Sequence, residues 1–217
     1  MADFARALKD TPFPHAVLDH PIDRRTVALA HREMTLLYAD FGHGWQRFRN
    51  QHEHKDALHW AYVPDQYDGI HTIREWMENP ATCEDIAGAF GLPPLTPDGL
   101  GGGLHVIPPG GHLGVHVDFN RHTDGRYRRV NLLLYVHGQE GHGGDLVLRA
   151  TPTGSGVTIG LRPGRLVAFA TSESSWHGHP DPYTPPDGLP RMSLAYYYYS
   201  TEAPEWSQSP HSTVFVG

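Results

Sequence analysis

The sequence predicts one mainly β domain that carries a helical layer at its N-terminal end. Two observations support this prediction. After residue 103, short apolar or β-branched runs recur between turns rich in glycine and proline, which is typical of a sandwich or barrel of short strands. Before residue 100, apolar residues repeat at helical spacing instead. We therefore expect a single domain over residues 1–217, with residues 1–100 as the helical layer and residues 101–200 as the β core.

The first part of the chain predicts a short strand and two helices. Residues 13–19 (FPHAVLD) are interpreted as an opening strand, and Asp23 can cap the helix that follows. The apolar stripe of that helix consists of Val27, Ala30, Met34 and Leu37. A second stripe, which Pro80 ends, consists of Ile70, Ile73, Trp76 and Met77. These stripes indicate faces that pack on a core.

A third helix and two irregular stretches complete this half. Thr82 and Asp85 have the spacing of a capping box, and Gly91 can end the helix that they begin. Residues 50–59 (NQHEHKDALH) are polar and follow no period, so no element is predicted there. Residues 93–103, rich in proline and glycine, are interpreted as a linker.

Seven short strands are predicted after this linker. Each is an apolar, β-branched or aromatic run bounded by turn residues. The runs cover residues 104–107, 113–119, 130–136, 146–148, 157–159, 166–170 and 192–199. So many short strands favour a sandwich or barrel over a parallel sheet that alternates with helices.

Composition and charge argue against several functional classes. The formal net charge of −7 disfavours nucleic acid as a partner, because phosphate binding needs a concentrated basic face. No apolar run has the length of a membrane span or a signal-peptide core. The lone Cys83 excludes a disulfide framework and a cysteine-built zinc site, and it fits a cytoplasmic location. The basic cluster of Arg126, Arg128 and Arg129, with Arg121 nearby, is interpreted as a solvated turn.

One His-x-Asp motif lies in a context that suits a metal site. Two side chains two residues apart on a strand point the same way, so such a pair can supply two ligands to one ion. With 17 histidines in the chain the motif also arises by chance, and it occurs at His54/Asp56, His116/Asp118, His122/Asp124 and His179/Asp181. Only His116 lies in a clean alternation, where Gly114, His116 and Asp118 share one face. An exposed outer strand face remains the alternative.

A third ligand is sought downstream of the strand at residues 166–170. Trp176 gives His177 an apolar setting, so we favour His177 and keep His179 as the alternative, since Pro180 and Pro182 place His179 in a loop. Two histidines and one carboxylate form the facial triad that binds Fe(II) in non-haem oxygenases. A core or rim histidine beside a tryptophan is the competing interpretation of His177.

Arg191 is a candidate anion-binding residue. It begins the run RMSLAYYYY, in which alternation places Arg191, Ser193, Ala195 and Tyr197 on one face. If that face lines a barrel interior, an unpaired guanidinium there is costly and calls for a carboxylate partner. Arginine can hold a carboxylate through two parallel hydrogen bonds, and the Ser193 hydroxyl can add a third. An arginine that reaches out to water from the strand end is the alternative.

Taken in order, these segments resemble a known family. The set consists of HVD at 116–118, RRVNLLLYV, GGDLVL, RPGRLVAF, WHGHP and RMSLAYYYY, with FPHAVLD as the opening strand. It resembles the prolyl 4-hydroxylase-like branch of the 2-oxoglutarate/Fe(II) oxygenases. The resemblance implies a double-stranded β-helix of the jelly-roll or cupin-like type, with the N-terminal helices packed on one sheet.

The resemblance also implies roles for particular residues. It assigns Fe(II) to His116, Asp118 and His177, and the C5 carboxylate of 2-oxoglutarate to Arg191. The residues that it implies around the co-substrate and substrate are Ser193, Tyr135, Asn131 and, beside the ligand strand, Asn120. The expected cofactors are Fe(II), 2-oxoglutarate and O₂.

The expected activity is hydroxylation of an unactivated C–H bond in a small molecule, an amino acid or a prolyl or peptidyl substrate, with release of succinate and CO₂. Asp118 stands where related halogenases have a small residue, which favours hydroxylation. The segment GQEGHGG departs from the acidic, tryptophan-containing loop of relatives. Two other functions stay open: a cupin-like metal enzyme that does not use 2-oxoglutarate, and a non-catalytic jelly-roll binding module.

Overall fold

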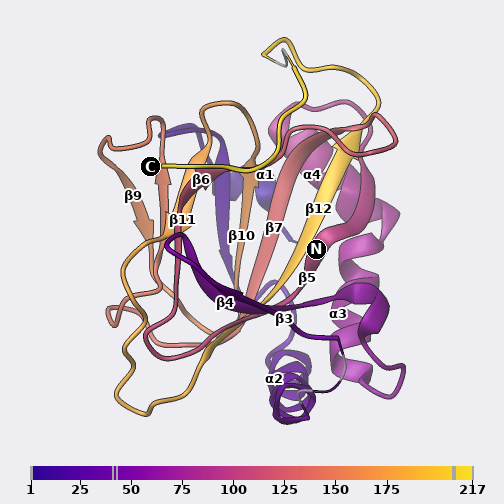
Figure 1. The fold of residues 1–217 in the computed structure, drawn as a ribbon. Helices are drawn as coiled ribbons and strands as arrows, with labels where there is room; N and C mark the ends of the chain where they lie inside the picture. Colours follow the sequence, from indigo (N-terminus) through magenta and orange to yellow (C-terminus); the bar gives the residue numbers. More distant parts are fainter. Residues whose placement is uncertain (1, 41, 43, 207–208, 217) are drawn as a thin grey trace.

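The computed structural model describes residues 2–40, 42, 44–206 and 209–216 (Figure 1). Its helices are α1 (Phe4–Ala7), α2 (Arg24–Ala39), the 3₁₀ turn η1 (Trp60–Tyr62), α3 (Asp68–Glu78) and α4 (Pro80–Phe90). Its strands are β1 (Leu8–Lys9), β2 (His15–Asp19), β3 (Gln46–Arg49), β4 (Glu53–His59), β5 (Thr96–Ile107), β6 (His112–Val117), β7 (Tyr127–His137), β8 (Leu146–Arg149), β9 (Gly156–Ile159), β10 (Arg165–Ala170), β11 (Trp176–His179), β12 (Arg191–Ser200) and β13 (Val214–Phe215).

The strands form one antiparallel sheet that curls over on itself. Its order is β1-β2-β10-β7-β12-β5-β4-β6-β11-β8-β9, with β13 added beside β6 and β3 beside β4. The sheet must curl, because strands far apart in this order share a core: Leu146 and Leu148 on β8 pack in one cluster with Val167 and Phe169 on β10. This curled sheet, with helices beside one part of it in Figure 1, confirms the predicted mainly β, jelly-roll fold.

Alternation along the central strands separates a helix-covered core from the interior of the roll. On β12, Met192, Leu194, Tyr196 and Tyr198 belong to the cluster that also contains the helix residues. Arg191 and Ser193, on the opposite face, line an internal cavity instead. The period of two that was read from the sequence therefore decides which β12 side chains can reach a site inside the roll.

The N-terminal helices form for the reasons that the sequence suggested, with one change. The Asp23 carboxylate accepts hydrogen bonds from the backbone N–H groups of Arg25 and Thr26 and so caps α2. The N-terminus of α3 is satisfied by another helix, because the buried Glu33 carboxylate of α2 accepts from the N–H groups of Gly69 and Ile70.

The start of the third helix was predicted wrongly. Its cap is Asn79, which accepts from the Ala81 N–H, and Pro80 occupies the first turn of α4. Pro80 therefore begins α4 and also follows the end of α3. Proline is tolerated at the first helical position because the N–H that it lacks would have no partner within the helix.

The first hundred residues contain more strand than expected. Residues 53–59, which showed no pattern, form β4, and the predicted linker contains the start of β5 at Thr96. The alternation of apolar residues along β4 was hidden because Asp56 occupies one of the two buried positions of this strand. Asp56 is fully buried and is bound by Arg49. A buried charge at an inward position breaks the hydrophobic alternation on which the strand prediction relies.

None of the described helices combines the length and apolar character needed to cross a membrane.

Gly103 allows β5 to pass close to β4, and we expect its replacement to be costly. It has a φ of +141°, and a Cβ there would overlap the carbonyl oxygen of Leu58. Gly110 also has a positive φ, +79°, but a Cβ there meets nothing within 4 Å. Gly110→Ala should lower the free energy of unfolding by about 1–2 kcal/mol for the left-handed backbone alone. Gly103→Ala should lose a further 2 kcal/mol or so, because β4 must shift. Equal losses in chemical denaturation would refute this account.

Candidate active site

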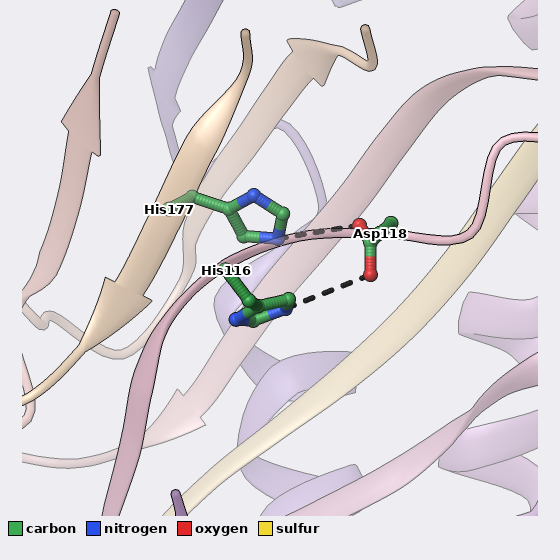
Figure 2. A group of neighbouring side chains, drawn as sticks. All are labelled: His116, Asp118 and His177. Atoms are coloured by element: carbon green, nitrogen blue, oxygen red, sulfur yellow. Dashed lines mark ion pairs between the residues drawn. The ribbon is translucent and has the colours of Figure 1, made fainter. Parts of the chain in front are cut away.

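Three side chains from two adjacent strands converge inside the roll (Figure 2). His116 lies on β6, Asp118 follows the end of β6, and His177 lies on β11 directly opposite His116 in the antiparallel pair. Asp118 Oδ1 is 3.6 Å from His116 Nε2, and Asp118 Oδ2 is 3.3 Å from His177 Nε2. One potential ligand atom from each residue lies within 4.8 Å of the others, so a single ion can contact all three.

Backbone carbonyls orient both histidine rings. His116 Nδ1 is 2.8 Å from the carbonyl oxygen of Gly114, and His177 Nδ1 is 2.9 Å from that of Ser175. A carbonyl can only accept, so each Nδ1 carries a proton, and Nε2 is the ring nitrogen that faces Asp118. Burial lowers the pKa of His177, and the nearby His116 lowers it further, so the neutral, ligating form is favoured. The sequence could not name these carbonyl acceptors.

Asp118 is held through one of its two oxygens. Its Oδ2 accepts a 2.7 Å hydrogen bond from the Asn131 amide and lies 3.1 Å from the Arg128 guanidinium. Burial raises the pKa of this carboxyl group, but the charge of Arg128, together with His177 and His116, lowers it more, and the net pKa lies well below the usual value. The carboxylate is therefore ionised, and Oδ1 stays free of these two donors.

Arg128 was wrongly assigned to a solvated turn. Its side chain is 1% exposed, its Nε donates to Asn131 Oδ1 at 2.7 Å, and the guanidinium stacks 3.5 Å from the centre of the Tyr197 ring. The pairing of β7 with β12 shifts register next to Arg129, and this bulge turns Arg128 toward the interior. No period in the sequence indicates such a bulge. The one available signal was that Arg128 lies close to the apolar run of β7.

A small cavity of about 80 Å³ adjoins the three convergent side chains. Among its lining residues are Arg191, Ser193, His105 and His179. Within the described part of the chain, Arg191 Nε and His179 Nδ1 are buried without a hydrogen-bond partner. Burial, with Lys55 and Arg191 nearby, lowers the pKa of His105 to about 3, so that ring is neutral. The cavity thus offers several polar groups that the protein itself does not satisfy.

Tyr135 and Arg191 lie together beside this cavity. The Arg191 guanidinium is 4.9 Å from the centre of the Tyr135 ring, and the buried Tyr135 hydroxyl also lacks a partner among the described residues. Burial raises the pKa of Tyr135 above its ordinary value, which keeps the phenol protonated and able to donate.

The loop placement of His179 was wrong. His179 ends β11, is buried, and pairs with Leu113, while His177 pairs with His116. Between these two pairs, one residue of β11 opposes two residues of β6, and this bulge explains why Leu113 and His116 both line the small cavity. His179 lies outside the convergent trio, which contains His177.

A larger cavity of about 600 Å³ also adjoins His116 and Asp118. Alternate residues of β4 line it, and these are Glu53, Lys55, Ala57 and His59. Lys55 reaches both cavities and is paired with Glu53 at 2.8 Å. This wall is not predicted by the sequence, because residues 50–59 follow no period.

Asn120 lies two residues beyond Asp118, and its side chain binds protein groups. Its amide nitrogen donates to Glu173 Oε1 at 2.9 Å and to the Ser209 carbonyl at 3.0 Å, and its oxygen accepts from the His211 N–H at 3.1 Å. Asn120 therefore joins three distant parts of the chain near the end of β6.

Comparison of the sequence with known families gives one match. Residues 102–199 match the 2OG-Fe(II) oxygenase superfamily, and this range contains the convergent trio and Arg191. No curated protein matches the chain significantly.

Solved structures share the fold at low sequence identity. A prolyl-4-hydroxylase from Pseudomonas putida aligns with a TM-score of 0.63 and 20% identity, over 85% of this chain and 91% of that one. A Trichoplax adhaerens prolyl hydroxylase, solved with a hypoxia inducible factor peptide, aligns with a TM-score of 0.63 and 15% identity, over 85% and 83%. The epimerase SnoN from nogalamycin biosynthesis was solved with Fe³⁺, α-ketoglutarate and nogalamycin RO. It aligns with a TM-score of 0.58 and 16% identity, over 94% of this chain and 91% of that one.

The family match, the fold and the two-histidine, one-carboxylate cluster agree. Residues 102–199 thus match the 2OG-Fe(II) oxygenase superfamily, within a fold that the chain shares with solved prolyl hydroxylases.

Proposed function

We propose that His116, Asp118 and His177 hold the Fe(II) ion of an enzyme that hydroxylates an unactivated C–H bond. One observation carries the proposal: three ligand atoms of the type that Fe(II) accepts lie within 4.8 Å of one another at the junction of two cavities. When bound, Fe(II) and 2-oxoglutarate supply the oxidation, in which 2-oxoglutarate and O₂ give succinate and CO₂ while one oxygen atom enters the substrate.

The residues present suit a divalent metal ion. The Nδ1 hydrogen bonds to Gly114 and Ser175 leave both Nε2 lone pairs available, and the donors to Asp118 bind only its Oδ2. In metal sites, partners of this kind fix the ring tautomer and the ligand orientation. We therefore assign Asn131 and Arg128 the role of holding the Asp118 carboxylate in place through its Oδ2.

The small cavity suits a dicarboxylate such as 2-oxoglutarate. Asp118 is the only carboxylate among the described residues that line it, and Arg128 already binds that group. Arg191 is thus a buried cation without a carboxylate partner in the cavity wall, and it calls for an anionic ligand. We propose that Arg191, Ser193 and the Tyr135 hydroxyl bind the far carboxylate, and that His179 Nδ1 contributes a further hydrogen bond.

The larger cavity is the proposed substrate site. Its volume of about 600 Å³ lies in the range of small-molecule pockets, and it reaches both His116 and Asp118. We propose a small-molecule or peptidyl substrate. This proposal is supported by structural relatives solved with a hypoxia inducible factor peptide and with nogalamycin RO.

Anaerobic reconstitution tests the metal ligands directly. Fe(II) and 2-oxoglutarate together should give the wild-type protein a visible charge-transfer band, which reports the co-substrate bound to iron. His116→Ala and Asp118→Ala should abolish the band, because each removes one of three protein ligands. His122→Ala is the matched control, since His122 belongs to another His-x-Asp motif and pairs with Asp124 instead. A band that survives in both ligand variants would show that iron binds elsewhere.

Arg191→Ala should raise the KM for 2-oxoglutarate roughly 10–100-fold, because a charge-assisted hydrogen bond contributes about 1.5–3 kcal/mol. Arg191→Lys should recover part of the loss, since it keeps the charge without the planar pair of donors. Arg162→Ala, which removes an exposed arginine paired with Glu140, is the control. Substrate turnover that is unaffected by Arg191→Ala and needs no 2-oxoglutarate would favour the cupin-like alternative.

Removal of Arg128 should destabilise the metal-free protein. Arg128→Met leaves the Asp118 carboxylate buried without its cation and should lower the free energy of unfolding by about 3–5 kcal/mol. Adding Asp118→Asn should restore part of the loss, because the unpaired charge is then gone. Arg126→Met, which breaks more exposed ion pairs with Asp98 and Asp124, should cost about 1 kcal/mol or less. Chemical denaturation of the wild type, Arg128→Met, Asp118→Asn and the double variant gives the coupling energy, and a value near zero would contradict the assignment.

A further inference from the structure

The segment formed by residues 209–216 returns to the metal-ligand strand although it lies outside the family match. In Figure 1 the yellow end of the chain crosses beside β6. There β13 pairs with β6, so that Val214 is opposite Val117 and Phe215 is opposite His116. The Val216 N–H also donates to the Val115 carbonyl at 2.9 Å. The segment thus adds a strand to the edge that carries His116.

The other end of this segment is anchored to both stretches that carry metal ligands. Asn120, two residues after Asp118, binds the Ser209 carbonyl and the His211 N–H. Glu173, four residues before His177, is 2.8 Å from His211 Nε2 and also accepts from the Asn120 amide. Asn120, at the centre of this anchor, is buried. The 209–216 segment is therefore fixed at both ends relative to the proposed iron site.

Between these attachments, the Phe215 ring lies against a proposed iron ligand. Its centroid is 5.1 Å from that of His116 at an interplanar angle of 38°, and it stacks with His52 at 4.7 Å and 13°. Phe215 and Thr213 line the larger cavity together with His116 and Asp118. Val214, the next residue on the strand, is 44% exposed and is absent from the cavity wall.

We propose that Phe215 is a positioning residue that closes the iron site on its His116 side and shapes the adjoining substrate cavity. The proposal rests on the assignment of iron to His116, Asp118 and His177. An apolar ring over a ligating histidine limits the access of water and of competing ligands to the metal, and it restrains the histidine ring. Because the ring also forms cavity wall, its size limits which substrates can approach His116 and Asp118.

Transfer of iron to a chelator tests this role without any knowledge of the substrate. The protein is loaded anaerobically with Fe(II) alone and mixed with a chromogenic Fe(II) chelator, and the rate of transfer is recorded. Phe215→Ala should accelerate the transfer about tenfold, the scale seen when groups around metal ligands are removed. Val214→Ala is the matched control on the same strand and should keep the wild-type rate. Phe215→Leu, which retains an apolar side chain of similar reach, should restore most of the protection.

The possible outcomes separate this inference from the proposed function. Wild-type protein that binds no Fe(II) would reject the iron site itself. Wild-type protein that binds Fe(II), with Phe215→Ala releasing it at the same rate, would overturn the role of Phe215. Equal acceleration in Val214→Ala and Phe215→Ala would overturn it too, because strand pairing rather than the ring would then protect the ion. Asn120→Ala should also accelerate transfer, and a wild-type rate there would overturn the role of the anchor.

Discussion

The largely buried carboxylate of Asp118, whose side chain is 12% exposed, is the constraint on which the site depends. A carboxylate at that depth must be compensated, and the interior supplies Arg128 and Asn131 on one oxygen and two histidines beside it. The same donors also orient the carboxylate. They bind Oδ2 and leave Oδ1 without a hydrogen bond from Asn131 or Arg128. The position of Arg128 in turn requires the bulge in β7, so a local irregularity of the backbone supports the whole cluster.

Charge pairing distinguishes the two cavities. In the larger one, Lys55 is matched by Glu53, and Arg128 by Asp118. In the smaller one, Arg191 has no carboxylate of its own among the described lining residues, and Arg191 Nε and His179 Nδ1 lack partners there. An unmatched buried cation beside unpaired donors suits a bound anion, whereas a cavity with internally matched charges relies on shape and neutral contacts. The two compartments therefore suit different ligands although they meet at the same three side chains.

The sequence predicted what regular alternation and motif order can encode. The inward face of β12 and the face shared by His116 and Asp118 follow from a period of two, and the order of motifs singled out the residues that the fold brings together. It could not predict Arg128 or the pairing of His179, because both depend on bulges that shift the period. The β4 wall was missed because the buried Asp56 interrupts the apolar pattern, and its partner Arg49 lies on another strand.

The walls of the two cavities come from different parts of the chain. The convergent trio, Arg191 and the small cavity lie largely within the family-matched residues 102–199. Much of the larger cavity is instead built by β3 and β4 before that range and by Thr213 and Phe215 after it. Two of these segments contact the strand that carries His116 by backbone pairing, since β4 and β13 both pair with β6. Side chains on β4 and β13 can therefore change the shape of the larger cavity while the positions of His116, Asp118 and His177 stay set by β6, β11 and Arg128.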